Sequence, residues 1–143
     1  MSGLADRNSQ TRAIVTGGAQ GIGFAVAEAL ADEGCRALAL VGRSQEKGDK
    51  AVAALKKAGV DAIFISADVA KVADCKRAIE TAIKHFGTLN ALVNAAATSA
   101  RGSLVETAEE LFAQIFDTNV RGPFFLMQGL VAHLLDRKAP GSI

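Results

Sequence analysis

The segment Thr16–Gly23 contains four glycines and joins a short apolar stretch, 12–16, to an apolar segment of helical periodicity, 21–33. Glycine reaches positive φ and lets an anion approach the backbone amides, where a Cβ would collide. Amides at the start of a helix are unpaired and lie at the positive end of its dipole. This setting predicts a site for the diphosphate of a dinucleotide, the alternative being a turn that only reverses the chain. The residues expected to form it are Gly17, Gln20, Gly21, Ile22 and Gly23.

Polar side chains also follow two later apolar stretches. Asp68 comes after the stretch 62–66, and Arg43 with Ser44 comes after the stretch 35–41. Proteins that bind NAD usually place an acidic residue on the ribose hydroxyl after the second strand, whereas arginine binds the additional phosphate of NADP. No acid stands at this place, so the sequence favours NADP(H). NAD(H) stays possible if Arg43 is only a solvated loop residue.

Short apolar stretches alternate with longer segments of helical periodicity along the chain. This alternation is typical of a parallel sheet that is covered by helices on both faces. A glycine follows each helical segment, where a helix C-terminus favours positive φ. The predicted fold class is therefore α/β, with a doubly wound parallel sheet. The pattern predicts strands at 12–16, 35–41, 62–66 and 89–95, and helices at 21–33, at 45–58 and up to Phe86.

A long apolar helix is predicted after the fourth strand. Thr107, with Glu110 three residues later, is typical of a capping box at its start. Gly122-Pro123 should kink or split this helix, because proline removes a backbone donor. Pro140-Gly141 should end it, and Ser142-Ile143 look like the opening of a fifth strand, after which the sheet would be truncated.

The composition indicates one domain, 12–143, after a flexible N-terminus, 1–11. Sixteen basic and fifteen acidic residues nearly balance, without the basic stripe that nucleic-acid binding needs. The start is polar, unlike a signal peptide, and no apolar run reaches membrane-spanning length, so we expect a cytoplasmic protein that binds no membrane. Cys35 and Cys75 lack companions at metal-ligand spacing, and no metal site is predicted.

The order and spacing of four motifs resemble the short-chain dehydrogenase/reductase family over nearly the whole chain. Thr-Gly-x-x-x-Gly-x-Gly resembles the cofactor turn of that family, and Asp68-Val69 resembles its adenine-contacting pair. Asn94-Ala95-Ala96-Ala97 is similar to its Asn-Asn-Ala-Gly motif, and Asn119 to its active-site asparagine. The resemblance implies a Rossmann fold and an NAD(P)(H)-dependent oxidoreductase. Such an enzyme transfers hydride between nicotinamide and a small alcohol or carbonyl substrate.

The resemblance also implies a role for each motif residue. The Asp68 carboxylate would accept a hydrogen bond from the adenine amino group, and the Val69 N–H would contact the ring; the alternative for Asp68 is a helix N-cap. Asn94, Ala95 and Ala96 would lie beside the nicotinamide ribose, although alanines replace the second asparagine and the glycine of the family motif. The alternative for Asn94 is a turn residue at the end of the strand. Asn119 would belong to a proton relay through water and a lysine, or it is a buried amide that bridges the helix backbone.

The resemblance places the reactive serine, tyrosine and lysine in a fifth strand and the helix after it. The sequence contains no tyrosine, so we expect a partial chain that is inactive by itself. The alternative is a non-catalytic NADP(H)-binding module that acts as a sensor or interaction protein. A homo-oligomer is expected, because strand four becomes an exposed edge and the long helix resembles the oligomer interface of the family.

Overall fold

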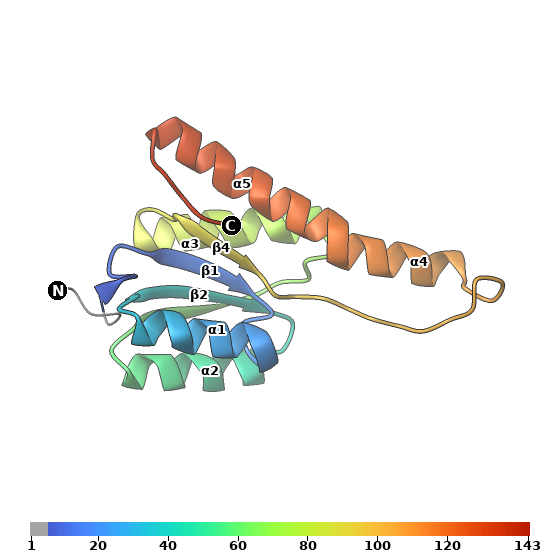
Figure 1. The fold of residues 1–143 in the computed structure, drawn as a ribbon, viewed down its shortest axis with the longest axis horizontal. Helices are drawn as coiled ribbons and strands as arrows, with labels where there is room; N and C mark the ends of the chain where they lie inside the picture. Colours follow the sequence, from blue (N-terminus) through green and yellow to red (C-terminus); the bar gives the residue numbers. More distant parts are fainter. Residues whose placement is uncertain (1–5) are drawn as a thin grey trace.

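A computed structural model describes residues 6–143, which contain a parallel sheet of four strands in the order β3-β2-β1-β4. The strands are β1 (Arg12–Thr16), β2 (Ala37–Gly42), β3 (Asp61–Ser66) and β4 (Ala91–Asn94), and Figure 1 labels β1, β2 and β4. The helices that follow them are α1 (Gly21–Asp32), α2 (Gln45–Lys57) and α3 (Val72–Phe86). The chain continues through α4 (Glu109–Phe116), the π-helix η2 (Asp117–Arg121) and α5 (Gly122–Arg137). The predicted α/β class and parallel sheet are therefore confirmed.

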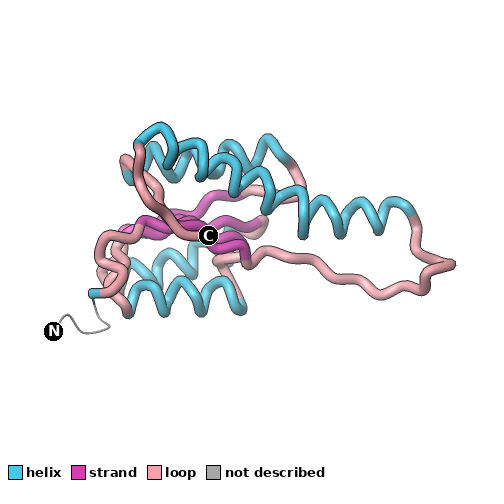
Figure 2. The backbone as a smooth tube through the Cα atoms, turned by 45° about the horizontal axis from the view of Figure 1, so that its top comes forward, coloured by secondary structure: helices cyan, strands magenta, loops and turns pink. Residues whose placement is uncertain are grey.

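The sheet lies between two layers of helices (Figure 2), because side chains alternate between its faces along each buried strand. On β1, Ile14 packs with the residues of α3 and α5, whereas Ala13 and Val15 pack with those of α1 and α2. Leu126 and Leu130 of α5 are buried in the first cluster. Both faces are thus covered, as a doubly wound sheet requires.

Two strands are shorter than the apolar pattern predicts. Cys35 was expected to begin the second strand, but its N–H donates to Leu30 O at 2.9 Å and closes the end of α1. Leu89 was expected to begin the fourth strand, but its N–H donates to Nε2 of His133 at 3.3 Å. Apolar residues that satisfy a helix end or a turn look the same in sequence as residues of a strand.

The sequence predicts a kink or a split of the long helix, and the structure has the π-helix η2 between α4 and α5 at this place. The helix is not broken there, because the backbone stays right-handed helical from Phe116 to Gly122. Pro123 lies in the first turn of α5, directly after η2, and its missing N–H removes one helical donor where the helix changes its hydrogen-bond pattern. The predicted capping box at Thr107 and Glu110 is wrong: α4 begins at Glu109, and its cap makes no side-chain hydrogen bond. Ser103 instead accepts the N–H of Glu106 at 3.2 Å, within the loop before α4.

The described residues at the two ends of the chain lie against the sheet and its helices. Asn8 donates to Glu33 through its backbone N–H and its side-chain amide, both at 2.7 Å; residues 1–5 of the expected flexible segment lie outside the described residues. Ser142 forms a parallel bridge with Ala91 beside β4, where a fifth strand is expected (Figure 1). Within residues 6–143, no helix is both long and apolar enough to span a bilayer.

Candidate functional site

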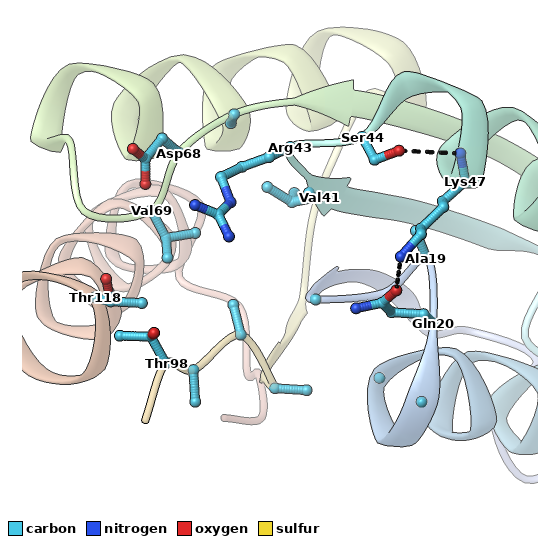
Figure 3. A pocket seen from close by; sticks show the side chains of 18 of the residues that line it. Ala19, Gln20, Val41, Arg43, Ser44, Lys47, Asp68, Val69, Thr98 and Thr118 are labelled. Atoms are coloured by element: carbon cyan, nitrogen blue, oxygen red, sulfur yellow. Dashed lines mark hydrogen bonds between the residues drawn. The ribbon is translucent and has the colours of Figure 1, made fainter. Parts of the chain in front are cut away.

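A cavity of about 440 Å³ opens at the carboxyl ends of the four strands. It lies where β1 has β2 on one side and β4 on the other, so that the strand order reverses there. Ligands of doubly wound sheets bind at such a reversal. Figure 3 shows the polar side chains that reach it, and its wall includes Gly17, Gln20, Gly21, Ile22, Gly23, Arg43, Ser44, Lys47, Asp68, Val69, Ala95, Ala96, Thr98, Gln114 and Thr118.

The glycines of the first turn meet different surroundings. A Cβ on Gly17 would lie 3.0 Å from the backbone C and O of Ala95, and a Cβ on Gly23 would collide with the carbonyl of Gly17. These two glycines let the turn pack tightly against itself and against the segment after β4. Gly21 has a φ of +55°, and a Cβ there would meet no protein atom within 4 Å. The open space at Gly21 belongs to the cavity, so a ligand can approach the backbone at this residue.

Thr16 holds the glycine turn and the segment after β4 together, a role that sequence reasoning missed. Its hydroxyl accepts the N–H of Ala95 at 3.2 Å and that of Ala96 at 3.1 Å. Thr16 is 1% exposed, so its hydroxyl is closed to solvent and bonds to the protein alone. These two bonds also end β4, because the amides bind a side chain instead of a neighbouring strand.

Cationic and hydroxyl groups line the cavity at the end of β2. The Arg43 guanidinium points into the cavity (Figure 3) and forms no ion pair with the residues that the structure describes. Ser44 caps α2, and its hydroxyl accepts the N–H of Lys47 at 3.4 Å. The Lys47 ammonium donates to Oε1 of Gln20 in the glycine turn. Sequence reasoning missed Lys47; its position in the first helical turn after Ser44 was the available signal.

The loop after β3 presents Asp68 and Val69 to the cavity. Asp68 is not the helix N-cap that was weighed as its alternative role, because α3 begins at Val72 with Lys71 as its cap. The Asp68 carboxylate accepts the N–H of Ala70 at 3.1 Å. The Asp68 N–H donates to Asp74 at 2.8 Å, and this bond, with that from Arg77, lowers the pKa of the Asp74 carboxyl below its usual value.

Two of the predicted site residues lie away from the cavity wall. Asn94 ends β4, and only the residues after it, from Ala95 to Thr98, line the cavity. Asn119 is not the buried amide that the apolar helix predicts: it is exposed on η2. Its Oδ1 accepts the Thr98 N–H at 2.9 Å, and its Nδ2 donates to Thr98 O at 2.8 Å. Asn119 therefore ties η2 to the segment after β4, and not to its own helix.

The chain is similar to known proteins in its sequence and in its fold. Residues 11–143 match the short chain dehydrogenase family. A short-chain dehydrogenase/reductase of Pestalotiopsis microspora is 38% identical over 122 residues, which are 85% of this chain and 46% of that protein. A putative short-chain alcohol dehydrogenase from Sinorhizobium meliloti superposes with a TM-score of 0.88 at 31% identity, over 94% of this chain and 53% of that one. A short chain dehydrogenase from Burkholderia cenocepacia in complex with NADP gives 0.85 at 34% identity, over 89% and 52%.

The chain thus spans about half the length of the relatives that it matches. The family match covers the glycine turn, the loop after β3 and the segment after β4, which together form the cavity. Because the family match spans residues 11–143 and the fold is shared, the chain belongs to the short-chain dehydrogenase family.

Proposed function

We propose that this chain supplies the nucleotide site of an NAD(P)(H)-dependent oxidoreductase that acts on a small alcohol or carbonyl compound. The observation that carries the proposal is the cavity between the glycine turn and the loop after β3, at the reversal of the strand order. Membership of the family supports an oxidoreductase as the whole protein. The substrate and the reaction are proposed for that whole protein, of which this chain is comparable to about half.

The residues present fit a dinucleotide. The open space at Gly21 and the amides at the start of α1 suit the diphosphate. Asp68 offers a carboxylate acceptor and Val69 a backbone donor to the edge of adenine. Arg43 and Lys47 supply positive charge beside the Ser44 hydroxyl, which suits the additional phosphate of NADP(H). NADP(H) is therefore favoured over NAD(H), in line with the NADP that the Burkholderia relative holds.

The bound nicotinamide would supply or accept the hydride. The segment from Ala95 to Thr98 would form the wall beside it, with Asn119 holding that wall through Thr98. A proton donor to the substrate is also needed, and this sequence has no tyrosine to act as the acid that the family resemblance implies. The 143-residue chain is accordingly proposed to bind the nucleotide without turning over a substrate.

The second candidate function is a non-catalytic NADP(H)-binding module that acts as a sensor or interaction protein. The cavity supports it, because nucleotide binding needs only the residues that line the cavity. Catalysis by the gene's full product would exclude this candidate. NADPH binding alone agrees with both functions.

Replacing Arg43 with aspartate is expected to reverse the cofactor preference. The carboxylate repels the additional phosphate and can accept a ribose hydroxyl, so the Kd of NADPH should rise by about 10 to 100-fold while that of NADH stays equal or falls. Titration by the fluorescence of the reduced nucleotide measures both Kd values. The chain has no tryptophan, so its own fluorescence does not interfere. Arg137→Asp makes the same charge change at the far end of α5 and should leave both constants unchanged. Equal weakening of NADPH and NADH by Arg43→Asp would contradict the assignment.

A homo-oligomer is part of the proposal, and an exposed apolar stripe supports it. The stripe consists of Phe112, Phe116, Val120 and Phe124, which are 55%, 48%, 55% and 55% exposed. The residues recur every four positions along α4, η2 and α5, and the rings of Phe112 and Phe116 stack at 4.4 Å. Monomeric proteins rarely expose such a continuous apolar surface. A second copy that presents the same stripe would cover it.

Phe116→Asp is expected to dissociate this oligomer, because a charge would be buried between two apolar surfaces. Light scattering coupled to size-exclusion chromatography should give a mass near one chain for the variant and a multiple of it for the unaltered protein. Leu104→Asp is the matched control, since Leu104 is 97% exposed but lies in the loop before α4. An unaltered protein that is monomeric at high concentration would refute the oligomer.

A further inference from the structure

In the loop after β3, three of four successive backbone N–H groups have a hydrogen-bond acceptor among the described residues and one has none. Asp68 donates its N–H to Asp74, Ala70 donates to the Asp68 side chain, and Lys71 donates to Asp68 O at 2.9 Å. Within residues 6–143, the N–H of Val69 has no such partner, although the residue is only 8% exposed. Backbone donors of buried residues are nearly always paired, so an open one on a cavity wall points to a ligand acceptor. Val69 lines the cavity.

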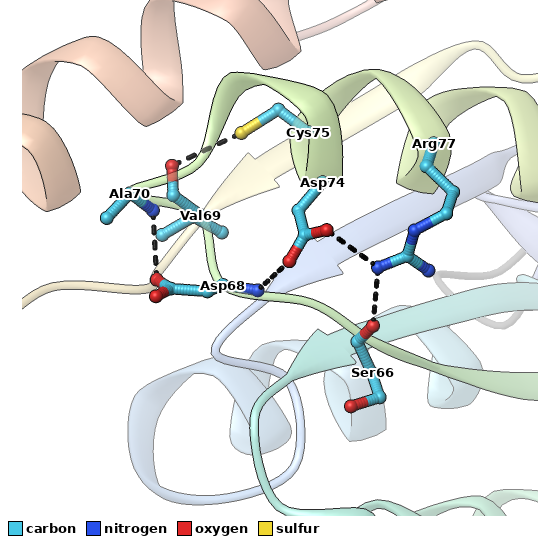
Figure 4. A network of polar contacts seen from close by, with 7 residues as sticks. All are labelled: Ser66, Asp68, Val69, Ala70, Asp74, Cys75 and Arg77. Atoms are coloured by element: carbon cyan, nitrogen blue, oxygen red, sulfur yellow. Dashed lines mark hydrogen bonds and ion pairs between the residues drawn. The ribbon is translucent and has the colours of Figure 1, made fainter.

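Asp74 and Arg77 hold this arrangement from outside the cavity. Asp74 lies on α3 and accepts the Asp68 N–H with Oδ2, while its Oδ1 accepts from Arg77 at 3.0 Å. Arg77 donates to the carbonyl of Ser66, the last residue of β3, at 2.8 Å. Figure 4 shows this network running from the end of β3 through α3 to Asp68. Neither Asp74 nor Arg77 lines the cavity, so both act on it through the loop.

The other side of the loop is fixed independently. The carbonyl of Val69 accepts a hydrogen bond from the Cys75 thiol at 3.2 Å. Gly122, at the start of α5, packs so closely that a Cβ there would collide with the same carbonyl. The peptide between Val69 and Ala70 is thereby held from behind. The bond from Asp68 to Asp74 fixes the peptide between Ala67 and Asp68. The peptide with the open Val69 N–H lies between these two fixed peptides, and the Asp68 carboxylate is held beside it.

We propose that Asp74, anchored by Arg77, is a positioning residue that sets Asp68 and Val69 to select a 6-amino purine over a 6-oxo purine in the bound nucleotide. The inference rests on the proposed function. A 6-amino purine presents an amino donor beside a ring-nitrogen acceptor, which complements a carboxylate acceptor beside an amide donor. A 6-oxo purine presents the reverse pattern, an oxygen acceptor beside an N–H donor. The wrong pattern leaves the groups of the site unpaired, which gives strong discrimination.

The test compares NADPH with its deamino analogue, in which hypoxanthine replaces adenine. For the unaltered chain we expect the analogue to bind at least about tenfold more weakly, as the loss of a hydrogen bond to a charged group implies. Asp74→Ala should raise the Kd of NADPH about tenfold and that of the analogue less than about twofold, which removes the discrimination. Asp74→Asn keeps an oxygen that can accept the Asp68 N–H, so it should retain part of the preference for NADPH over the analogue.

Two further variants complete the experiment. Asp61→Asn removes an ion pair with His85 at the opposite end of β3 and should leave both constants unchanged. Arg77→Gln keeps the bond between Asp74 and Asp68 but removes the guanidinium that holds the Asp74 carboxylate. The ratio between the Kd of the analogue and that of NADPH should therefore fall, but less than in Asp74→Ala. This variant also serves as the test if Asp74→Ala does not fold.

The outcomes separate the inference from the proposed function. The inference is overturned if Asp74→Ala leaves the ratio of the two Kd values unchanged. This happens if the variant weakens both nucleotides equally, which would make Asp74 a general structural residue, or if it weakens neither. In both cases the nucleotide site itself would stand. If the unaltered chain binds neither nucleotide, the proposed function fails and the inference fails with it.

Discussion

Gly21→Val is expected to abolish NADPH binding while the chain still folds. The space beside Gly21 is empty of protein atoms to 4 Å, so the new side chain would occupy the place through which a diphosphate reaches the backbone amides. Displacing the anion from two such amides forfeits about 1.5–3 kcal/mol for each charge-assisted hydrogen bond, so the Kd should rise by more than about 100-fold. Titration by nucleotide fluorescence measures this loss.

The control must separate exclusion of the ligand from strain in the backbone. Gly21 has a φ of +55°, a conformation that valine adopts only at a cost in stability. Gly59 has a φ of +80°, and a Cβ there would also meet no atom within 4 Å, but the residue lies beyond the end of α2 and away from the cavity. Gly59→Val should lower the thermal stability to a similar extent and leave the Kd unchanged. Unaltered NADPH affinity in Gly21→Val would remove the assigned phosphate site.

The order of the elements followed from the sequence because each apolar stretch and each helical segment ends at a local signal. Gly87, for example, has a φ of +77° and ends α3 at the predicted place. The start of β2 did not follow, because Cys35 closes the end of α1 instead of beginning the strand. The start of β4 did not follow either, because a contact with a distant residue decides it. His133, on α5, accepts the N–H of Leu89 and withdraws this residue from the strand. A partner so far along the chain leaves no local signal.

The residues of the candidate site also fall into those that the sequence predicts and those that only the fold brings to the cavity. The glycine turn, Arg43 and Asp68 carry their chemistry in their own residue types and lie on the cavity wall, where binding of a cofactor stays a prediction. Lys47 reaches the wall because the first turn of α2 lies beside Gln20 of the glycine turn, and the neighbouring position arises only in the fold. Asn119 was expected to be buried because its neighbours are apolar, but these neighbours form an exposed stripe instead of a core.

Thr16→Val is expected to destabilise the whole sheet and to weaken nucleotide binding. Valine has nearly the shape of threonine, so the variant removes the hydroxyl and leaves the packing in place. The amides of Ala95 and Ala96, which belong to half-buried residues, then lose their acceptor. An unsatisfied donor costs about 1–3 kcal/mol when it is fully buried. These two donors are partly buried, so the free energy of unfolding should fall by about 2–4 kcal/mol in total, as measured by urea denaturation.

Thr16→Ser is the matched control, because serine keeps the hydroxyl and loses only a methyl group. Its cost should be about 1 kcal/mol, the value of one buried carbon. The two variants also differ in their effect on the site: the segment from Ala95 to Thr98 is a wall of the cavity, and only Thr16→Val releases it from the glycine turn. NADPH affinity should therefore fall in Thr16→Val and not in Thr16→Ser. Equal stability of the two variants would show that water or another group satisfies these amides. The Thr16 hydroxyl would then have no part in joining the glycine turn to the segment after β4.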